Sequence, residues 1–473
     1  MDVLRTALGH AEAHLSDLGD RPVATAANLG AMRRALGGPI PDAPQDPVAV
    51  IDLLVDGVAP GLVASPGPRY FGFVTGGAVP TALAADWLTA AWDQNAMLGV
   101  MSPATAVVEE IAADWVLQLL GLPSDCSVGF VTGAQMANVT CLLAGRHHVL
   151  AATGWDDATR GLTGAPPIRV IVGAEAHVTI PAALRFIGLG VATAVIDVDG
   201  QGRMRPDALV DELARGGGPT IVCAQAGNVN TGACDALEPI ADACEEAGAW
   251  LHVDGAFGLW AAAAPARRHL VAGAGRGDSW ATDGHKWLNV PYDSGIAITA
   301  HPHSHRAALA LALTAAYLSA GGDLRDGSDW APEASRRARG FAIWAAIRAL
   351  GRQGVTDLVE RCCALAMRMA ARLDAAQGVD VLNEVVLNQA LIRFTPPAGD
   401  ANAFTDAVIG QVQEDGVCWA GGTTWNGVRA MRISVSNWST SEADADRSVE
   451  AILAAQAAVL RRWQAPQPDV SRR

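Results

Sequence analysis

The chain carries one side-chain amine in a sequence almost free of lysine. Of its 34 Lys and Arg residues, 33 are arginine and one is lysine, Lys286. Both serve as solvated surface charge, but only lysine readily loses its proton and attacks a carbonyl group. Composition alone favours two explanations of the single lysine about equally: a coding bias that left one lysine by chance, and a lysine kept for its reactive amine. The setting of Lys286, in the largely apolar stretch TDGHKWLNVPYDSG, favours the reactive amine.

Asp254 ends the apolar run LHVD. A carboxylate at the end of a buried strand is costly unless it has a partner. The common alternative is an Asp that caps the N-terminus of a helix. Asp254 precedes the His285–Lys286 pair by about thirty residues, and the two pieces together are more specific than either alone.

Two further segments carry candidate binding groups. In FVTGAQMANVTCLLAG a strand, a turn of small residues and a helix follow one another, which aims backbone N–H groups at an anion. Many strand–helix turns look alike, so this signal is weak alone. His177, in GAEAHVTIPAAL, could stack on a flat ring or be a buried core histidine, and the bare sequence favours the core histidine.

Alternating strands and helices position these residues. Near-continuous apolar runs separated by helices predict a parallel-rich α/β sheet buried on both faces. The seven predicted strands span 128–132, 169–177, 193–198, 220–227, 250–256, 279–284 and 295–300. Ligands of such sheets bind at the carboxyl ends of the strands. The polar residues at those ends are Thr132, Gly133, His177, Asn228, Asp254, His285 and Lys286.

We expect three segments along the chain. Residues 1–75 form an N-terminal arm with a helix and Pro/Gly-rich stretches, and residues 76–335 form the large domain with the sheet. Residues 336–473 form a smaller α+β domain, which opens with a long helix over 336–354 and has short strands near 380–395 and 428–436.

Composition excludes several classes of function. The net charge of −15 disfavours a nucleic-acid partner, and no apolar run reaches the roughly 18 residues of a membrane span. The first residues lack the pattern of a signal peptide. Eight scattered cysteines without a CxxC pair predict free thiols in the cytoplasm and no metal site. No GxGxxG follows a strand, which disfavours a nicotinamide dehydrogenase.

The motifs LHVDGAFG, DGHKW, TGAQMAN and GAEAH, in their spacing, resemble the group II decarboxylases that depend on pyridoxal 5′-phosphate (PLP). These include aromatic-amino-acid, histidine and glutamate decarboxylases and, more distantly, sphingosine-phosphate lyase. The resemblance runs from about residue 65 to the C-terminus. It implies an α/β fold of type I, with a mostly parallel seven-stranded large domain, a small α+β domain, and active sites at a homodimer interface.

The resemblance also implies roles for single residues. Lys286 would carry PLP as a Schiff base, Asp254 would pair with the pyridine nitrogen, and His177 and Ala256 would lie on the two ring faces. Further cofactor contacts would come from Gly133, Ala134, Gln135, His285 and Asn228, the last of which stands where the family usually has Thr. The substrate would meet Phe73, Asn95, Met97 and Arg432, with Asn95 and Met97 reaching the partner subunit's site.

The sequence departs from the family pattern at three positions. Met136 stands where Glu is usual, and Asp283 stands where an Asn often contacts the phosphate. We expect Asp283 to face His285 or to point away, because its charge repels a phosphate. Gly327 stands where the family has a loop Tyr that donates a proton after CO2 leaves, and Tyr317 is an uncertain substitute.

The leading interpretation is therefore PLP-dependent decarboxylation of an L-amino acid. The missing loop Tyr motivates a second interpretation, carbon–carbon lyase or aldolase chemistry, or decarboxylation coupled to oxidative deamination. A third, a PLP-binding protein without catalysis, is least favoured because every direct contact with the ring is present.

Overall fold

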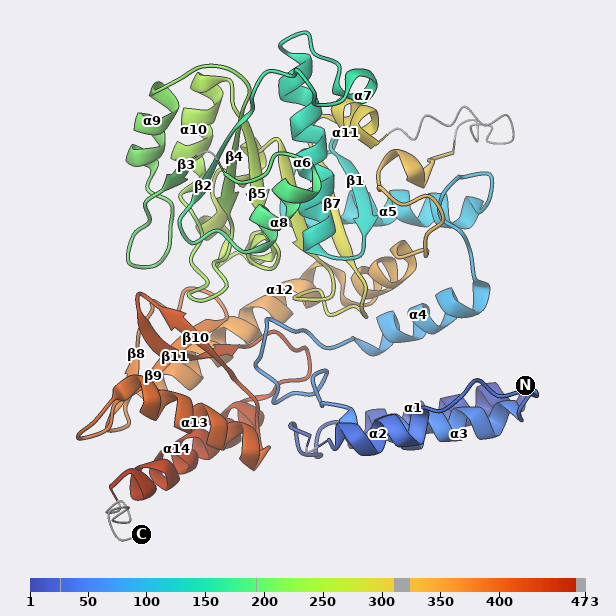
Figure 1. The fold of residues 1–473 in the computed structure, drawn as a ribbon, viewed down its shortest axis with the longest axis vertical. Coiled ribbons are helices and arrows are strands. Elements are labelled where there is room, and N and C mark those ends of the chain that lie inside the picture. The colour runs from blue at the N-terminus through green and yellow to red at the C-terminus, as the bar shows by residue number, and fades with distance from the viewer. Residues whose placement is uncertain (26, 193, 310–323, 465–473) are drawn as a thin grey trace. The chain divides into compact units, whose positions relative to one another are not determined.

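The computed structural model describes residues 1–25, 27–192, 194–309 and 324–464, which fall into two compact units. The first, here the sheet unit, contains residues 76–367 and 383–390. The second, the terminal unit, combines residues 1–75 with 368–382 and the chain from 391 onward. Figure 1 shows both as ribbons.

The sheet unit is built on a seven-stranded sheet whose strand order is β1-β7-β6-β5-β4-β2-β3. Its strands are β1 (Ser127–Val131), β2 (Arg169–Gly173), β3 (Ala194–Ile196), β4 (Thr220–Gln225), β5 (Trp250–Asp254), β6 (Ser279–Asp283) and β7 (Gly295–Thr299). Strands β3, β2, β4, β5 and β6 are parallel neighbours, while β7 runs antiparallel to both β6 and β1. The predicted mostly parallel α/β sheet is therefore confirmed.

The strands of the sheet are apolar in sequence because most of their residues are buried. Every residue of β4, β5, β6 and β7 is buried, as expected for strands covered on both faces. Between and around the strands lie α4 (Pro80–Trp92), α5 (Pro103–Leu120), α6 (Ala134–Ala151), α7 (Asp157–Arg160), α8 (Thr179–Phe186), α9 (Pro206–Ala214), α10 (Leu237–Ala247) and α11 (Pro302–Leu309). Short 3-10 turns span Ala59–Gly61, Gly258–Ala263, Arg268–Val271, Ala274–Arg276 and Gly327–Asp329.

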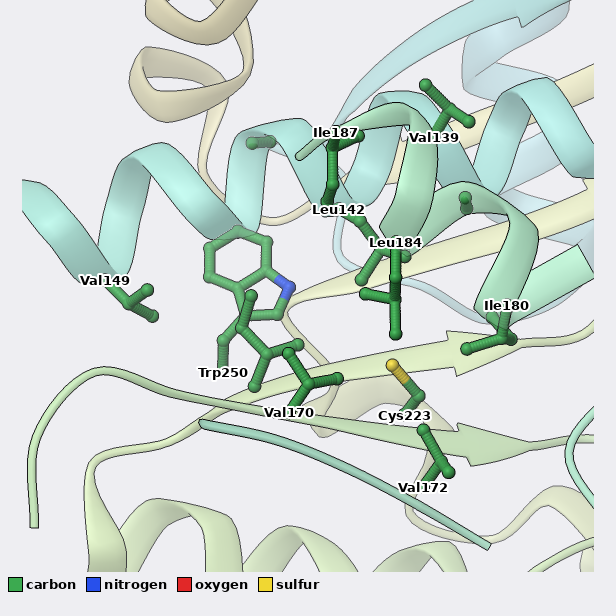
Figure 2. Close-up of a cluster of buried hydrophobic side chains, with 13 residues drawn as sticks. Val139, Leu142, Val149, Val170, Val172, Ile180, Leu184, Ile187, Cys223 and Trp250 are labelled. Atoms are coloured by element: carbon green, nitrogen blue, oxygen red, sulfur yellow. The ribbon is translucent and has the colours of Figure 1, made fainter. Parts of the chain in front are cut away.

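A hydrophobic cluster holds α6 and α8 on one face of the sheet (Figure 2). Leu142 of α6 and Leu184 of α8 pack with Val170, Cys223 and Trp250, which come from β2, β4 and β5. The indole of Trp250 lies directly against α6, where Gly145 faces it: a Cβ at Gly145 would approach the ring to about 3 Å. This close approach fixes α6 over the parallel strands.

Helix α12 (Gly340–Asp374) differs from the predicted long helix over 336–354. It begins at Gly340, and Gly351 interrupts it with φ 61° and ψ −179°. Glycine adopts this conformation without the steric cost that a side chain would bring. Two helices therefore meet at Gly351 within the segment that the sequence pattern joins into one.

The terminal unit contains helices from both ends of the chain and a second sheet. Its helices are α1 (Asp2–Asp17), α2 (Leu29–Leu36), α3 (Pro47–Val58), α13 (Ala401–Asp415) and α14 (Glu442–Gln464). Its sheet, in the order β10-β11-β9-β8, consists of β8 (Val379–Val381), β9 (Gln389–Phe394), β10 (Gly421–Trp425) and β11 (Val428–Ser434). The helices α1 and α2 both contact α3. None of the helices in the described part of the chain is long and apolar enough to cross a membrane.

Candidate active site

The polar residues singled out in the sequence gather at one edge of the seven-stranded sheet. The parallel strands β5 and β6 end at Asp254 and Asp283, and β1, which runs in the same direction, ends just before Gly133. The carboxyl ends of parallel strands lie at the same edge, where α/β folds bind ligands. Lys286 follows Asp283 by three residues, so it lies at this edge too.

Lys286 forms an ion pair with the strand-end carboxylate. Its Nζ lies 2.9 Å from Asp283 Oδ2, and its side chain is 19% exposed. The backbone around it is tightly packed, because a Cβ at Gly76 would overlap the carbonyl oxygen of Lys286. The amine is thus held at the sheet edge, next to the Asp283 carboxylate.

The Asp283 side chain also contacts the N-terminus of α6. Its Oδ1 accepts a 2.6 Å hydrogen bond from the Ala134 N–H, at the helix end where backbone donors attract anions. The sequence led us to expect that Asp283 faces His285 or points away. It does approach His285 Nε2, at 3.5 Å, but its shorter contacts are to Ala134 and Lys286. The physical reason is that an N–H group and an amine attract this carboxylate more strongly than a neutral imidazole.

His285 is held as a neutral ring. Burial lowers its pKa, and the opposing effect of Asp283 is smaller. Its Nδ1 accepts a 3.2 Å hydrogen bond from the Ser294 N–H, so the ring proton lies on Nε2, toward Asp283. The ring also packs on Tyr292, with centroids 4.4 Å apart. His285 therefore presents a fixed donor next to the start of α6.

The turn before α6 has no room for side chains. A Cβ at Gly133 would lie 3.4 Å from His285 Cε1, and one at Gly295 would overlap the Gly133 backbone. Strand β7 therefore packs directly against the backbone of this turn. Ala134 and Gln135 form the first residues of that helix, so their backbone N–H groups belong to its unpaired N-terminal turn.

Asp254 is a buried carboxylate held only by neutral donors. Its Oδ1 accepts from the Ala256 N–H at 3.2 Å, and its Oδ2 accepts from Asn138 Nδ2 at 3.3 Å. It is 4% exposed, and none of the ion pairs between residues that the structure describes includes it. A buried anion of this kind fits a cationic partner such as the protonated nitrogen of a pyridine ring.

His177 and Asn228 follow the strands β2 and β4. His177 Nδ1 lies 2.9 Å from Thr179 Oγ1, the hydroxyl of the first residue of α8. Asn228 is buried, and its Oδ1 accepts hydrogen bonds from the N–H groups of Asn230 and Thr231, at 2.8 and 3.2 Å. Its Nδ2 donates to the Glu175 carbonyl. Asn228 thus organises its own loop through Oδ1 and ties it through Nδ2 to the segment after β2.

Asn95 and Met97 lie in a segment of the sheet unit that is bound to residues 335–337. Asn95 Oδ1 accepts from the N–H groups of Met97 and Arg336, and its Nδ2 donates to Ser335 Oγ at 3.2 Å. Met97 is buried. The Asn95 amide therefore shapes the segment around Met97 within its own chain.

Phe73 and Arg432 belong to the terminal unit. Phe73 is 67% exposed, has φ 54° and stacks on Trp419 with centroids 5.5 Å apart. Arg432 lies on β11 opposite Gly421 of β10, and burial lowers the pKa of its guanidinium.

Gly327 occupies a position without space for any side chain. A Cβ there would overlap the Arg336 guanidinium and the Ala96 carbonyl oxygen. Arg336 cannot move aside easily, because Glu109 holds it in a buried bidentate pair at 2.7 and 2.8 Å. Tyr317, the other residue considered as a proton donor, lies outside the described residues.

Four residues that were not predicted from the sequence are linked by hydrogen bonds to Asp254 or His177, directly or through one another: Asn138, Thr179, His252 and Ser279. The signal was present for His252, because period-two alternation along WLHVD places Trp250, His252 and Asp254 on one face of the strand. Asn138 lies four residues after Ala134, on the first turns of α6.

The residues at this sheet edge fit PLP. They offer one amine for its aldehyde, one buried carboxylate for its ring nitrogen, and a helix N-terminus with a neighbouring neutral histidine for its phosphate. The negative charge of Asp283 at that helix end opposes a phosphate.

Comparisons with known proteins agree with this chemistry. The model of the pyridoxal-dependent decarboxylase conserved domain matches residues 30–395. Acidic amino acid decarboxylase GADL1 of Bos taurus is 29% identical over 340 residues, which make up 70% of this chain but only 64% of the bovine protein. The aromatic-L-amino-acid decarboxylase of Bacillus atrophaeus is 25% identical over 393 residues, or 81% of this chain and 79% of that protein.

A solved structure shares the fold. The crystal structure of Oryza sativa TDC with PLP and tryptamine superposes with a TM-score of 0.89 at 22% identity, over 97% of this chain and 98% of the rice chain. The family match covers well over half of the sequence and confirms both the resemblance and the PLP cofactor. The chain belongs to the pyridoxal-dependent decarboxylase family.

Proposed function

We propose that this protein decarboxylates an L-amino acid, using PLP bound to Lys286. The observation that carries the proposal is that the only lysine of the sequence and the buried carboxylate of Asp254 lie at the ends of neighbouring strands. Asp254 is opposite Ala281 in the β5–β6 register, and Lys286 follows five residues after Ala281. A reactive amine and a buried carboxylate that forms no ion pair with any described residue thus come from adjacent strand ends.

Each residue at the sheet edge has a defined task in this proposal. When bound, PLP supplies the electron sink that makes a bond at the substrate Cα breakable. Asp254 would hold a proton on the ring nitrogen, because the donors that the structure shows for its buried carboxylate, the Ala256 N–H and Asn138 Nδ2, are neutral. His177 and Ala256, which the family resemblance assigns to the ring, would hold it and exclude water from it.

The phosphate-binding task falls to the start of α6. The N–H groups of Ala134 and Gln135 point out of the helix end, and the Nε2–H of His285 lies beside them. Asp283 must yield its bond to the Ala134 N–H when a phosphate binds there. Lys286, whose Nζ lies 2.9 Å from Asp283 Oδ2, would supply the amine that holds the cofactor aldehyde.

We also propose that the protein is a homodimer. Support comes from large apolar side chains that are exposed in and after α4: Trp87, Leu88, Trp92, Val100 and Met101. Exposed apolar side chains gathered in one short segment are typical of a protein–protein interface. The segment includes Asn95 and Met97, which the family resemblance assigns to the partner subunit's site. An active protein that remains monomeric in light scattering at micromolar concentration would contradict this assembly.

We place the protein in the cytoplasm. All eight cysteines are free, and seven of them are buried. Free thiols in this number fit a reducing compartment. A fractionation that finds the native protein in an oxidising compartment would refute this assignment.

The decisive experiment has two parts. Purified protein incubated with PLP is expected to turn yellow, borohydride should fix the cofactor on the peptide that contains Lys286, and Lys286→Ala should stay colourless. A panel of L-amino acids is then scored separately for CO2, amine, aldehyde and ammonia. Wild-type protein that stays colourless refutes PLP binding. Protein that releases no CO2 from any amino acid but cleaves β-hydroxy amino acids breaks the Cα–Cβ bond instead, a reaction that the decarboxylase family match does not favour.

A further inference from the structure

A continuous hydrogen-bonded network connects Asp254 with His177 through the interior of the sheet unit. Asn138 of α6 lies at its centre and is fully buried. Its Nδ2 lies 3.3 Å from both Asp254 Oδ2 and Thr179 Oγ1, and its Oδ1 lies 2.9 Å from His252 Nε2. Thr179 Oγ1 in turn lies 2.9 Å from His177 Nδ1.

The network continues along β5 away from the sheet edge. His252 Nδ1 lies 2.9 Å from Ser279 Oγ, and the same oxygen lies 2.9 Å from Trp250 Nε1. Trp250, His252 and Asp254 share one face of β5 because side chains alternate along a strand. The close packing of α6 on Trp250 brings Asn138 onto this face.

The charge of Asp254 fixes the direction of every hydrogen bond in the network. An ionised carboxylate only accepts, so the NH2 group of Asn138 must face Asp254 and its oxygen must face His252. His252 Nε2 must then donate, and its Nδ1 must accept from the Ser279 hydroxyl. The indole N–H of Trp250 can only donate, so Ser279 Oγ accepts from it.

The other branch fixes the proton of His177. The second N–H of Asn138 points to Thr179 Oγ1, so the hydroxyl proton of Thr179 is directed to His177 Nδ1. The backbone N–H of Thr179 also approaches this nitrogen, at 3.4 Å. Since Nδ1 accepts, a neutral His177 carries its proton on Nε2.

We propose that Asn138 and His252 are positioning residues that hold the Asp254 carboxylate in place for the cofactor ring and couple it to His177. This inference rests on the proposed binding of PLP at this sheet edge. Burial lowers the pKa of His252 to about 3, so the ring stays neutral and keeps its single donor on Nε2 throughout the working pH range. The network therefore delivers one neutral amide hydrogen bond to Asp254 and adds no charge that would compete with a pyridinium.

A double-mutant cycle on PLP affinity tests whether Asn138 acts through Asp254. The dissociation constant is measured by titrating the protein with PLP and following its visible absorbance. Asn138→Leu should weaken binding about tenfold in the wild-type background, the loss of about one charge-assisted hydrogen bond. It should weaken binding less than twofold in a chain that also carries Asp254→Ala. Equal losses in both backgrounds would show a merely structural role and overturn the proposal.

The matched control lies on the same helix. Thr140 is fully buried and its hydroxyl donates only to the Met136 carbonyl of α6, at 2.8 Å, so Thr140→Val removes a buried hydrogen bond outside the network. It should leave PLP affinity unchanged. A loss as large as that of Asn138→Leu would attribute the effect to general loosening of α6.

A second pair of variants remains informative if Asn138→Leu does not fold. Glutamine can place an N–H where His252 has Nε2 and an oxygen where it has Nδ1, whereas leucine can do neither. His252→Gln should keep PLP affinity within about threefold, and His252→Leu should lose about tenfold. Equal affinities of the two variants would overturn the role of His252. Wild-type protein that does not bind PLP at all would instead refute the proposed function, so the two failures are distinguishable.

Discussion

The amine of Lys286 and the carboxylate of Asp283 lie 2.9 Å apart at the end of β6, and the same carboxylate accepts the Ala134 N–H at the start of α6. One anion thus holds both the reactive amine and the phosphate-binding helix end. A phosphate that binds at this helix end must either displace the Asp283 carboxylate or bind next to its negative charge.

This arrangement predicts how Asp283→Asn changes cofactor binding. Removing the charge should relieve the repulsion of the phosphate at the start of α6. We expect PLP to bind about three- to tenfold more tightly at neutral pH, the effect of one nearby charge at a partly shielded site. The measurement is a PLP titration followed by visible absorbance.

The control for this variant is Asp278→Asn, at the opposite end of β6. Asp278 pairs with His301 at 2.7 Å, so this variant makes the same charge change far from Lys286 along the strand. It should not alter PLP affinity. Weaker binding by Asp283→Asn would mean that Asp283 serves the bound cofactor rather than opposing it.

Asp254→Asn should abolish most of the activity. The buried carboxylate would lose its charge, and the ring nitrogen would lose the group that keeps it protonated. We expect kcat to fall by about 100-fold or more, the cost of removing one partner of a buried charge pair. Asp157→Asn, which changes a buried carboxylate paired with Arg146 and His147, should keep kcat within a few fold. Near-normal turnover of Asp254→Asn would assign the ring nitrogen to another residue.

Glu109→Gln should strongly destabilise the sheet unit. Glu109 binds Arg336 through both oxygens, at 2.7 and 2.8 Å, and Arg325 lies 3.9 Å away. Burial lowers the pKa of Arg325 to about 10, although Glu109 opposes this effect. Removing the carboxylate leaves two buried guanidinium groups without their anion, at a cost of about 3–5 kcal/mol in the free energy of unfolding.

Urea denaturation of the apoprotein measures this cost. The exposed pair of Arg205 and Asp207 provides the comparison, since Asp207→Asn should leave the urea midpoint unchanged. If both variants unfold at the wild-type midpoint, the buried pair contributes nothing to stability.

Asp235 should make stability depend on pH. Its carboxylate is fully buried and accepts the N–H groups of Met204 and Gln225, both at 2.7 Å, without an ion pair among the described residues. Burial raises its pKa to about 6, above its value in the unfolded chain. As the pH falls through 6, the folded state takes up a proton before the unfolded state does, so this group makes folding more favourable.

The variant Asp235→Asn isolates this contribution. The difference in unfolding free energy between wild type and variant should move in favour of wild type as the pH is lowered from 8 to 5. Other titrating groups are common to both proteins and cancel in the difference. A pH-independent difference would show that Asp235 does not titrate in this range.

The sequence was sufficient for the sheet and for the position of its key side chains. The seven strands occur where apolar runs predicted them, because strands buried on both faces must be apolar throughout. The parallel order then brings Asp254 and Lys286 to one edge. These features depend on local pattern and on general rules of α/β topology, so a single sequence carries them.

Other features depend on tertiary packing that the sequence does not encode locally. The contact between Asn138 and His252 requires the register between α6 and β5, which residues such as Gly145 and Trp250 set. The break at Gly351 was missed because one glycine does not disturb the apolar pattern of a helix. Strand β10 was missed because its sequence, GGTTW, has little apolar character.

Lys286 has a practical consequence beyond catalysis. Since no other residue bears an ε-amine, any reagent selective for primary amines labels this chain at Lys286 and at its α-amino group alone. The extent of acylation, read from the intact mass, then reports directly on how many copies have a free amine and how many hold cofactor. The same property warns against attaching the protein to surfaces through its amines, because such coupling would consume the residue on which the proposed chemistry depends.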